Sequence, residues 1–75
     1  MHWQDSITID PQVRSGKPSL RGTRITVVDV LEYLAGGMSQ EEIIADFPAL
    51  TVDHVRACLA YAATRDKRFH DLGAV

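Results

Sequence analysis

The segment TVVDVLEYLAGGMSQEEIIADFP, which runs from Thr26 to Pro48, contains two helix starts and two helix stops. At each start, a hydroxyl residue suited to the N-cap position is followed three residues later by an acid. Thr26 precedes Asp29 in this way, and the pair of Ser39 and Glu42 forms a full capping box. The segment therefore predicts helices that begin directly after Thr26 and directly after Ser39.

The ends of these helices are equally clear, and a third helix start follows them. Gly36-Gly37 ends the first helix, because glycine readily adopts the left-handed conformation found at helix C-termini. Pro48 ends the second helix, because the residue before a proline is biased away from helical angles. Thr51 then provides a third N-cap, with Asp53 in the first turn near the positive helix end. A third helix is predicted over Val52 to Phe69.

Apolar residues support all three helix starts and distinguish the third helix. Each N-cap has an apolar residue before it and another five residues later, which is the pattern of a hydrophobic staple. The stretch from Ala57 to Ala63 is apolar nearly all round, and such a helix is buried on more than one side. One small chain can hardly supply that cover, so we expect a homodimer. The staple pairs are Ile25 with Val30, Met38 with Ile43, and Leu50 with Val55.

The first quarter of the chain predicts short strands. Trp3, Ile7 and Ile9 fall on one face by alternation, and Asp10-Pro11 breaks the run. The stretch PSLRGTRI suits a second short strand with a turn or bulge at Gly22.

Together these elements predict a mainly α fold, in which a trihelical helix-turn-helix-like domain is preceded by a short N-terminal β-hairpin or an intersubunit sheet. We expect one domain over residues 1–75. Residues 1–25 hold the short strands and a basic loop, residues 26–69 the three helices, and residues 70–75 a short tail. A core of this size is marginal alone, and oligomerisation is a common remedy.

The composition excludes several classes of protein. The chain has 75 residues, a formal net charge of -2 and one cysteine, Cys58, so it has no intrachain disulfide and suits a reducing, cytoplasmic setting. It shows no signal peptide and no apolar run near the ~20 residues that a membrane helix needs. It also lacks a catalytic triad, paired carboxylates and a phosphate-binding glycine loop, so we expect no enzyme, no cofactor and no metal.

Half of the eight Lys and Arg residues of this slightly acidic chain gather around the stretch GKPSLRGTR. Glycines let the backbone approach a ligand closely, and arginines pair bidentately with carboxylate or phosphate. The stretch is therefore a candidate anion-binding or partner-binding loop. Two alternatives stay open: a turn whose cations are solvated, and an arginine that reaches Asp29 or Glu32 on the first helix. The candidates are Arg14, Lys17, Arg21 and Arg24, with a second basic cluster of Arg65, Lys67 and Arg68.

The start of the third helix is a weaker candidate, for DNA. A helix that reads the major groove offers Arg, Lys, Asn or Gln near its N-terminus. The DNA-facing candidates here are Thr51, His54 and Arg56; only Arg56 has suitable chemistry, and Asp53 would repel phosphate. Helix packing is the favoured interpretation. His54 and Cys58 share one helical face, but no second pair of ligands accompanies them, so a buried structural cysteine is favoured over a metal site.

A series of motifs runs in order from Ile7 to Ala62. These are the Asp10-Pro11 step, GKP, RGTRI, a double glycine followed by S.EEI, DFP.LT and LAYA. In this order they resemble a small prokaryotic family, the domain-of-unknown-function family four-three-three, which often carries Tyr where this chain has Phe47. Its most recognisable motif is matched at Gly16, Lys17, Pro18, Arg21, Gly22, Thr23 and Arg24.

The resemblance implies an antitoxin-like protein of the VapB type, often encoded beside a PIN-like ribonuclease toxin, with a helix-turn-helix-like fold and a short N-terminal sheet. Nucleases of that class gather acidic side chains around divalent metal. An antitoxin can neutralise them by presenting Arg or Lys to those carboxylates, or by blocking RNA entry. Arg21 and Arg24 are the first candidates for this role, and the second basic cluster follows.

Two other functions stay open. The chain can be a stand-alone helix-turn-helix regulator that binds DNA, and an antitoxin can itself repress its own operon. It can also be a purely structural dimerisation module. A strongly salt-dependent DNA shift indicates a DNA-binding protein, a stable complex with the neighbouring gene product indicates an antitoxin, and a structural module shows neither.

The capping box at Ser39 leads to a first prediction. We expect Ser39→Ala to lower the free energy of unfolding by roughly 0.5–2 kcal/mol, because the substitution removes the N-cap of a short helix. Thermal or chemical denaturation measures the change. Unaltered stability would mean that the second helix does not begin here.

Overall fold

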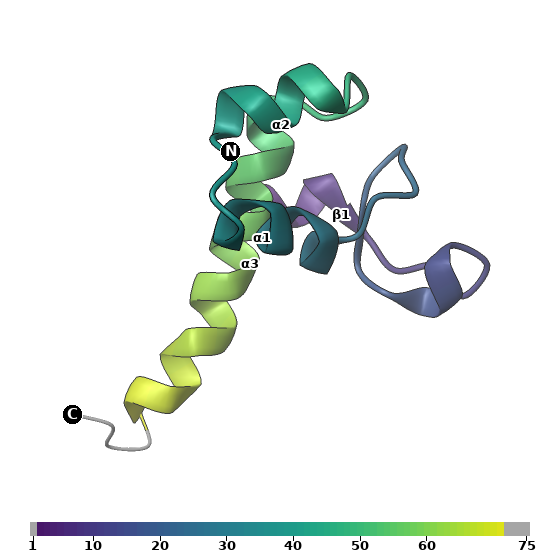
Figure 1. Ribbon diagram of the computed structural model, residues 1–75. Helices are drawn as coiled ribbons and strands as arrows, with labels where there is room; N and C mark the ends of the chain where they lie inside the picture. Colours follow the sequence, from purple (N-terminus) through teal and green to yellow (C-terminus); the bar gives the residue numbers. More distant parts are fainter. Residues whose placement is uncertain (1, 72–75) are drawn as a thin grey trace.

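The structure is a computed structural model that describes the backbone of residues 2–71 and the side chains of residues 2–65. Three α-helices follow a short antiparallel two-stranded hairpin, so the predicted mainly α fold is confirmed (Figure 1). The elements are the 3₁₀ helix η1 (Trp3–Ser6), β1 (Ile7–Thr8), the 3₁₀ helix η2 (Arg14–Gly16), β2 (Ser19–Leu20), α1 (Val27–Ala35), α2 (Gln40–Asp46) and α3 (Val52–Asp71).

Reciprocal side-chain caps start the first two helices where the sequence predicts them. The Thr26 hydroxyl accepts a hydrogen bond from the Asp29 amide at 3.0 Å, and the Asp29 carboxylate accepts one from the Thr26 amide at 3.1 Å. Ser39 and Glu42 repeat this arrangement at 3.1 and 2.8 Å. Each box satisfies backbone N–H groups that have no partner inside the helix.

The third helix start uses a different residue from the acid that the sequence pointed to. The His54 amide donates to the Thr51 hydroxyl at 3.2 Å, and the Thr51 amide donates to Nδ1 of His54 at 3.1 Å. An imidazole thus takes the place of the carboxylate in the capping box, which requires that Nδ1 carries no proton. Asp53 is exposed in the first turn.

The predicted helix stops are also confirmed. α1 ends at Ala35, and Gly37 follows with φ of 102°, a left-handed conformation that glycine adopts without steric cost. α2 ends one residue before Phe47, which precedes Pro48 and has non-helical angles. The Phe47 ring stacks on Tyr33 with 5.0 Å between ring centroids, so the turn packs back onto α1.

The N-terminal segment differs from its prediction. Trp3 lies in the 3₁₀ helix η1, not in a strand, and its ring meets Tyr61 of α3 edge-on at 6.2 Å. The strand itself is only two residues long, with Ile7 opposite Leu20, and Ile9 is 66% exposed. The contact between Trp3 and Tyr61 favours a helical turn at Trp3 over a longer strand. The alternation of apolar residues along the chain does not reveal this contact.

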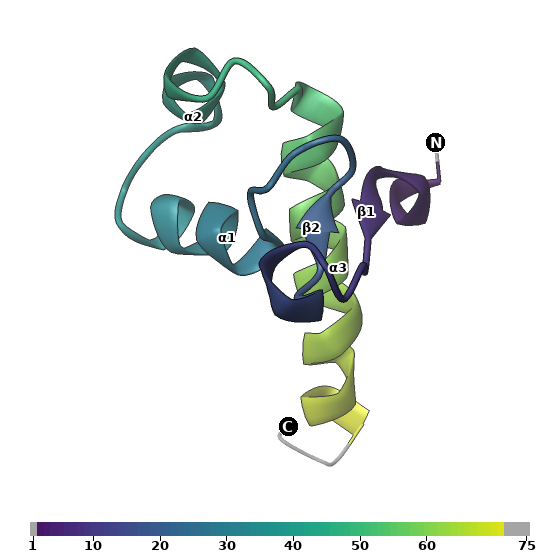
Figure 2. The ribbon, with the colours of Figure 1, turned by 90° about the vertical axis from the view of Figure 1, so that its right-hand side faces the viewer.

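α3 forms the axis of the domain and contacts η1, α1 and α2. Figure 2 shows α1 on one side of α3 and β1 with η1 on the other, with β2 drawn across α3 and α2 near its N-terminal end. α3 then continues past the other elements (Figure 1). Along it, Ala57 and Cys58 are buried but Leu59 is 48% exposed. The core cluster consists of Leu20, Val27, Val30, Ile43, Leu50, Val55 and Cys58.

The staple residues lie where the pattern predicts, since the second member of each pair is buried and the first is buried or packed against the core. No helix in the part of the chain that the structure describes is long and apolar enough to cross a lipid bilayer.

The buried staple residue of α2 gives a second prediction. We expect Ile43→Ala to lower the free energy of unfolding by about 2–5 kcal/mol, because Ile43 is fully buried in a small core and its loss leaves a cavity. Ile44→Ala is the matched control, since the neighbouring side chain is only half-buried and its removal should cost less. Urea denaturation of both variants measures the difference, and equal losses would contradict the described core.

Candidate functional site

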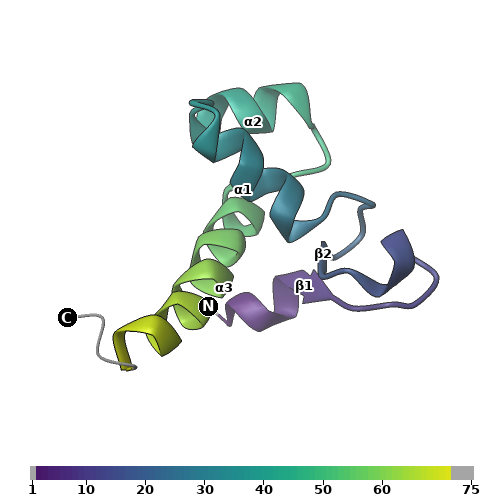
Figure 3. The ribbon, with the colours of Figure 1, turned by 60° about the horizontal axis from the view of Figure 1, so that its bottom comes forward.

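The candidate site is built on the basic turn, which we define as residues 14–24. It contains η2 and β2 and lies between β1 and α1 in the chain, and its η2 end lies away from α3 (Figure 3). Arg14, Ser15 and Gly16 all have positive φ, at 50°, 60° and 79°. Positive φ is uncommon for residues other than glycine, so other contacts must hold this left-handed turn in place.

The side chain of Arg14 supplies those contacts. Its Nη1 donates to the Arg24 carbonyl at 3.0 Å and to the Asp29 carboxylate at 3.0 Å. One guanidinium therefore joins the start of the basic turn, its end, and the first turn of α1. The structure thus gives Arg14 an internal role, in agreement with the alternative that an arginine of this stretch reaches Asp29.

Arg21 also bonds within the chain. Its Nε donates to the Asp5 carbonyl at 2.6 Å and its Nη2 to the Ile7 carbonyl at 3.5 Å. Its backbone amide donates to the Ser6 carbonyl at 2.8 Å. The adjacent Gly22, at φ of 82°, permits the tight turn that Thr23 closes on Leu20. Arg21 therefore ties the basic turn to η1 and β1.

All four cations of the basic turn are exposed, but Lys17 and Arg24 differ from the two others in their bonding. Neither side chain has a hydrogen bond or an acidic partner among residues 2–65. The rest of the turn is held internally, so these two charges stand on a fixed backbone. They can meet a carboxylate or a phosphate with little further ordering.

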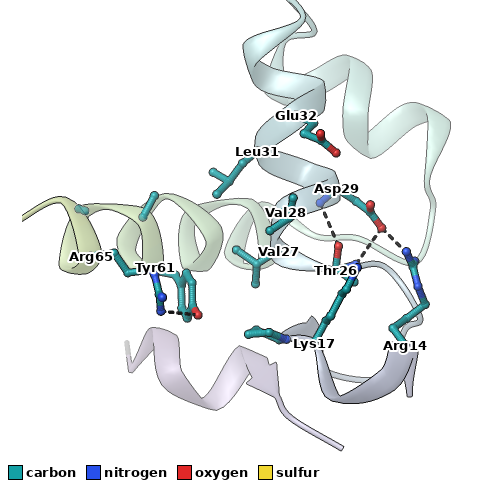
Figure 4. Close-up of a pocket in the computed structure, with 13 residues that line it drawn as sticks. Arg14, Lys17, Thr26, Val27, Val28, Asp29, Leu31, Glu32, Tyr61 and Arg65 are labelled. Carbon is teal, nitrogen blue, oxygen red and sulfur yellow. Dashed lines mark hydrogen bonds and ion pairs between the residues drawn. The ribbon is translucent and has the colours of Figure 1, made fainter. Parts of the chain in front are cut away.

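A groove of about 1040 Å³ lies beside the basic turn, between α1 and α3 (Figure 4). Apolar side chains of both helices face it, and charged side chains stand around them. Arg65 lies over the Tyr61 ring at 5.3 Å and donates to the Tyr61 hydroxyl at 2.9 Å. The apolar lining residues are Pro18, Val27, Val28, Leu31, Tyr61, Ala62 and Ala63, and the charged ones are Arg14, Lys17, Asp29, Glu32 and Arg65.

The electrostatics of Asp29 follow from its position under the basic turn. Partial burial alone raises the pKa of this carboxyl, but hydrogen bonds from the Thr26 amide and hydroxyl and the charge of Arg14 outweigh it. The net effect is a pKa below the ordinary value. Glu42 also has a lowered pKa, because its carboxylate accepts the Ser39 cap bond. Both acids therefore stabilise the fold in their ionised form.

The residues considered for metal binding do not form a ligand set. Cys58 is fully buried, and desolvation raises the pKa of its thiol to about 12, which disfavours the thiolate that a metal requires. Among the residues that the structure describes, no three His, Cys, Asp or Glu side chains stand close enough to hold an ion.

Of the three DNA-facing candidates at the start of α3, Thr51 and His54 bond within the chain, whereas the Arg56 side chain makes no bond to another described residue. Thr51 and His54 bond each other in the third cap, which uses Nδ1 of His54 and the Thr51 hydroxyl oxygen. Arg56 is exposed two residues after His54, and the exposed Asp53 lies three residues before Arg56. This helix end therefore offers one free cation beside an acid, a poor match for a phosphate backbone.

The second basic cluster is placed only in part. Arg65 borders the groove and contacts Tyr61, whereas the side chains of Lys67 and Arg68 lie outside the described residues. Sequence reasoning missed the groove and the role of His54. A signal existed for each: Tyr61 and Arg65 are four residues apart on one helical face, and His54 occupies the third helical position after Thr51.

Comparisons with known proteins agree with this fold. The model of a family described as "Protein of unknown function (DUF433)" matches residues 7–62. An uncharacterised protein of Sinorhizobium fredii (strain NBRC 101917 / NGR234), y4eO, is 32% identical over 65 residues, which are 87% of this chain. This chain spans only 29% of that relative. The crystal structure of a DUF433 member from Anabaena variabilis ATCC 29413 is similar at a TM-score of 0.78 and 29% identity, over 91% of this chain and 67% of that one.

The lowered pKa of Asp29 gives a third prediction. We expect Asp29→Asn to cost about 0.5–1.5 kcal/mol near neutral pH, because the charged partner of Arg14 is lost while an amide still accepts the cap bond. A lowered folded-state pKa stabilises the protein above the ordinary pKa, and that stability is lost as pH falls through the folded value. The variant should therefore lose less stability than the wild type when acidified.

Denaturation midpoints near pH 7 and pH 3 measure this difference. Asp46→Asn is the control, because that exposed carboxylate makes no hydrogen bond within residues 2–65. If the Asp29 variant and the wild type lose equal stability between the two pH values, the ion pair does not stabilise the turn.

Proposed function

This chain belongs to the DUF433 family of proteins of unknown function, and we propose that it is an antitoxin that binds and neutralises a PIN-like ribonuclease. The observation that carries the proposal is that two of the four cations of the basic turn bond within the chain and the other two do not. Arg14 and Arg21 hold the turn by bonds within the chain, whereas the exposed side chains of Lys17 and Arg24 make no such bond among residues 2–65.

A nuclease of this class is a suitable partner for such a surface. Its active site gathers carboxylates around divalent metal, so a cation placed among them competes with the metal and with the phosphates of RNA. Arg24 can bond a carboxylate bidentately, and Lys17 adds a compact positive charge. Because the turn is held by bonds to η1, β1 and α1, the two charges lose little freedom on binding.

The structure also changes the order of the candidates. The sequence favours Arg21 as a first candidate, but its guanidinium donates to the carbonyls of Asp5 and Ile7. Removing Arg21 would release those carbonyls and loosen the N-terminal segment. Lys17 therefore replaces Arg21 beside Arg24 in the proposed contact.

Repression of its own operon is a weaker part of the proposal. The start of α3 is capped by Thr51 and His54 and carries the exposed Asp53 beside Arg56. Binding to DNA would then depend on Lys17 and Arg24 meeting phosphates, without base reading by this helix. Such binding would be weakened by salt and would discriminate little between sequences.

A charge-reversal variant tests the proposed function. We expect Lys17→Glu with Arg24→Glu to keep the fold, since neither side chain bonds another described residue, and to weaken binding to the PIN-like nuclease encoded beside this gene by at least about tenfold. Calorimetric titration measures affinity, and cleavage of a labelled RNA measures inhibition. Arg56→Glu is the matched control, because it reverses an exposed cation outside the basic turn and the groove.

The outcomes separate the alternatives. Full inhibition by the double variant would overturn the assignment of Lys17 and Arg24. A wild-type protein that does not bind the nuclease, but shifts its own promoter DNA in a salt-dependent way, would identify a regulator in place of an antitoxin.

A further inference from the structure

The groove between α1 and α3 exposes a contiguous set of apolar side chains. Its apolar side chains include Val28, which is 55% exposed, and Leu31 and Tyr61, which are half-buried. Figure 4 shows Val27 and Leu31 of α1 on the side that faces Tyr61 of α3. Contiguous apolar surface with a charged border is typical of protein interaction sites.

The interior of the domain is small by comparison. In the part of the chain that the structure describes, eight apolar residues are buried, and two of them are alanine and cysteine. Domains of this size often reach adequate stability by oligomerisation. α3 also continues beyond the elements that pack on its first half (Figure 1), and an isolated helical segment of this length is marginal in water. Both features favour a partner that covers α3 beside the groove.

The charges around the groove indicate which partner fits. Glu32 borders it from α1, Lys17 from the basic turn and Arg65 from α3, and none of the three has an ionic partner among residues 2–65. An acidic partner segment would meet Glu32, and a basic one would meet both cations. A surface that carries both signs complements itself when a two-fold axis pairs residue i with j and j with i.

We propose that the occupant of the groove is a second copy of this chain, bound by a two-fold axis through the α1–α3 face. The apolar side chains of each groove then cover those of the other, and Glu32 of each copy faces Arg65 of its partner. Ala62 and Ala63 let the two backbones approach closely at this point. This inference concerns the chain alone, so it stands or falls independently of nuclease binding.

The test is the mass in solution of the wild type and of two matched variants. By sedimentation equilibrium at micromolar concentration, we expect the wild type at twice the 8.3 kDa of one chain. Val28→Glu should raise the dissociation constant by about tenfold or more, because each copy would bury a charge in the interface. The fold should persist, since Val28 is exposed and an acid in a first helical turn suits the positive helix end.

Val52→Glu is the matched control, because Val52 is also an exposed valine in a first helical turn, 43% accessible, but it does not line the groove. It should remain dimeric. Circular dichroism checks that both variants are folded. A monomeric wild type would overturn the proposal, and so would a Val28→Glu protein that stays dimeric, which would place the interface elsewhere, for example at the strands.

A charge variant distinguishes self-association from a different occupant. Glu32→Lys makes the unpaired charges of the border all positive, so two copies should repel and the dimer should weaken. If the groove instead takes an acidic segment of the nuclease, the same substitution should strengthen nuclease binding and leave the mass of the free protein unchanged. That second result would overturn the proposal.

Discussion

The arrangement of this domain depends on the hydrogen bonds that the Asp29 carboxylate accepts. The carboxylate accepts a hydrogen bond from the Thr26 amide, which begins α1, and another from Arg14, which closes the basic turn. The basic turn and the start of α1 therefore meet at one acid. Because the same bonds lower its pKa, the ionised form that makes these contacts is also the form that folding favours.

This anchor explains how a slightly acidic protein can keep a basic surface on a small scaffold. Arg14 bonds Asp29 and the carbonyl of Arg24, so one cation is used to hold the backbone that carries another. Arg21 does the same toward η1 and β1. A turn held at both ends keeps unusual backbone angles, at Arg14 and Ser15, that a free loop would relax. The exposed side chains of Lys17 and Arg24 therefore project from a fixed backbone.

One copy of the chain buries only part of the apolar surface of α3. Its apolar stretch packs Ala57 and Cys58 into the core, whereas Leu59 is half exposed and Tyr61 faces the groove. The ring of Tyr61 makes two contacts, since it meets the Trp3 ring edge-on and Arg65 lies over its face. An all-round apolar helix is thus divided between an interior side and sides that remain accessible to a partner.

The helix starts and stops could be predicted from local sequence, because caps, staples and glycine or proline stops act over three to five residues. Thr26, Ser39 and Gly37 could be assigned for that reason. Contacts in the folded chain were needed to show that Trp3 leaves the strand to meet Tyr61. They were also needed to show that Arg14 and Arg21 bond within the chain while the side chains of Lys17 and Arg24 make no bond among residues 2–65. Those choices depend on contacts between residues 14 to 58 positions apart in the chain, which no local pattern encodes.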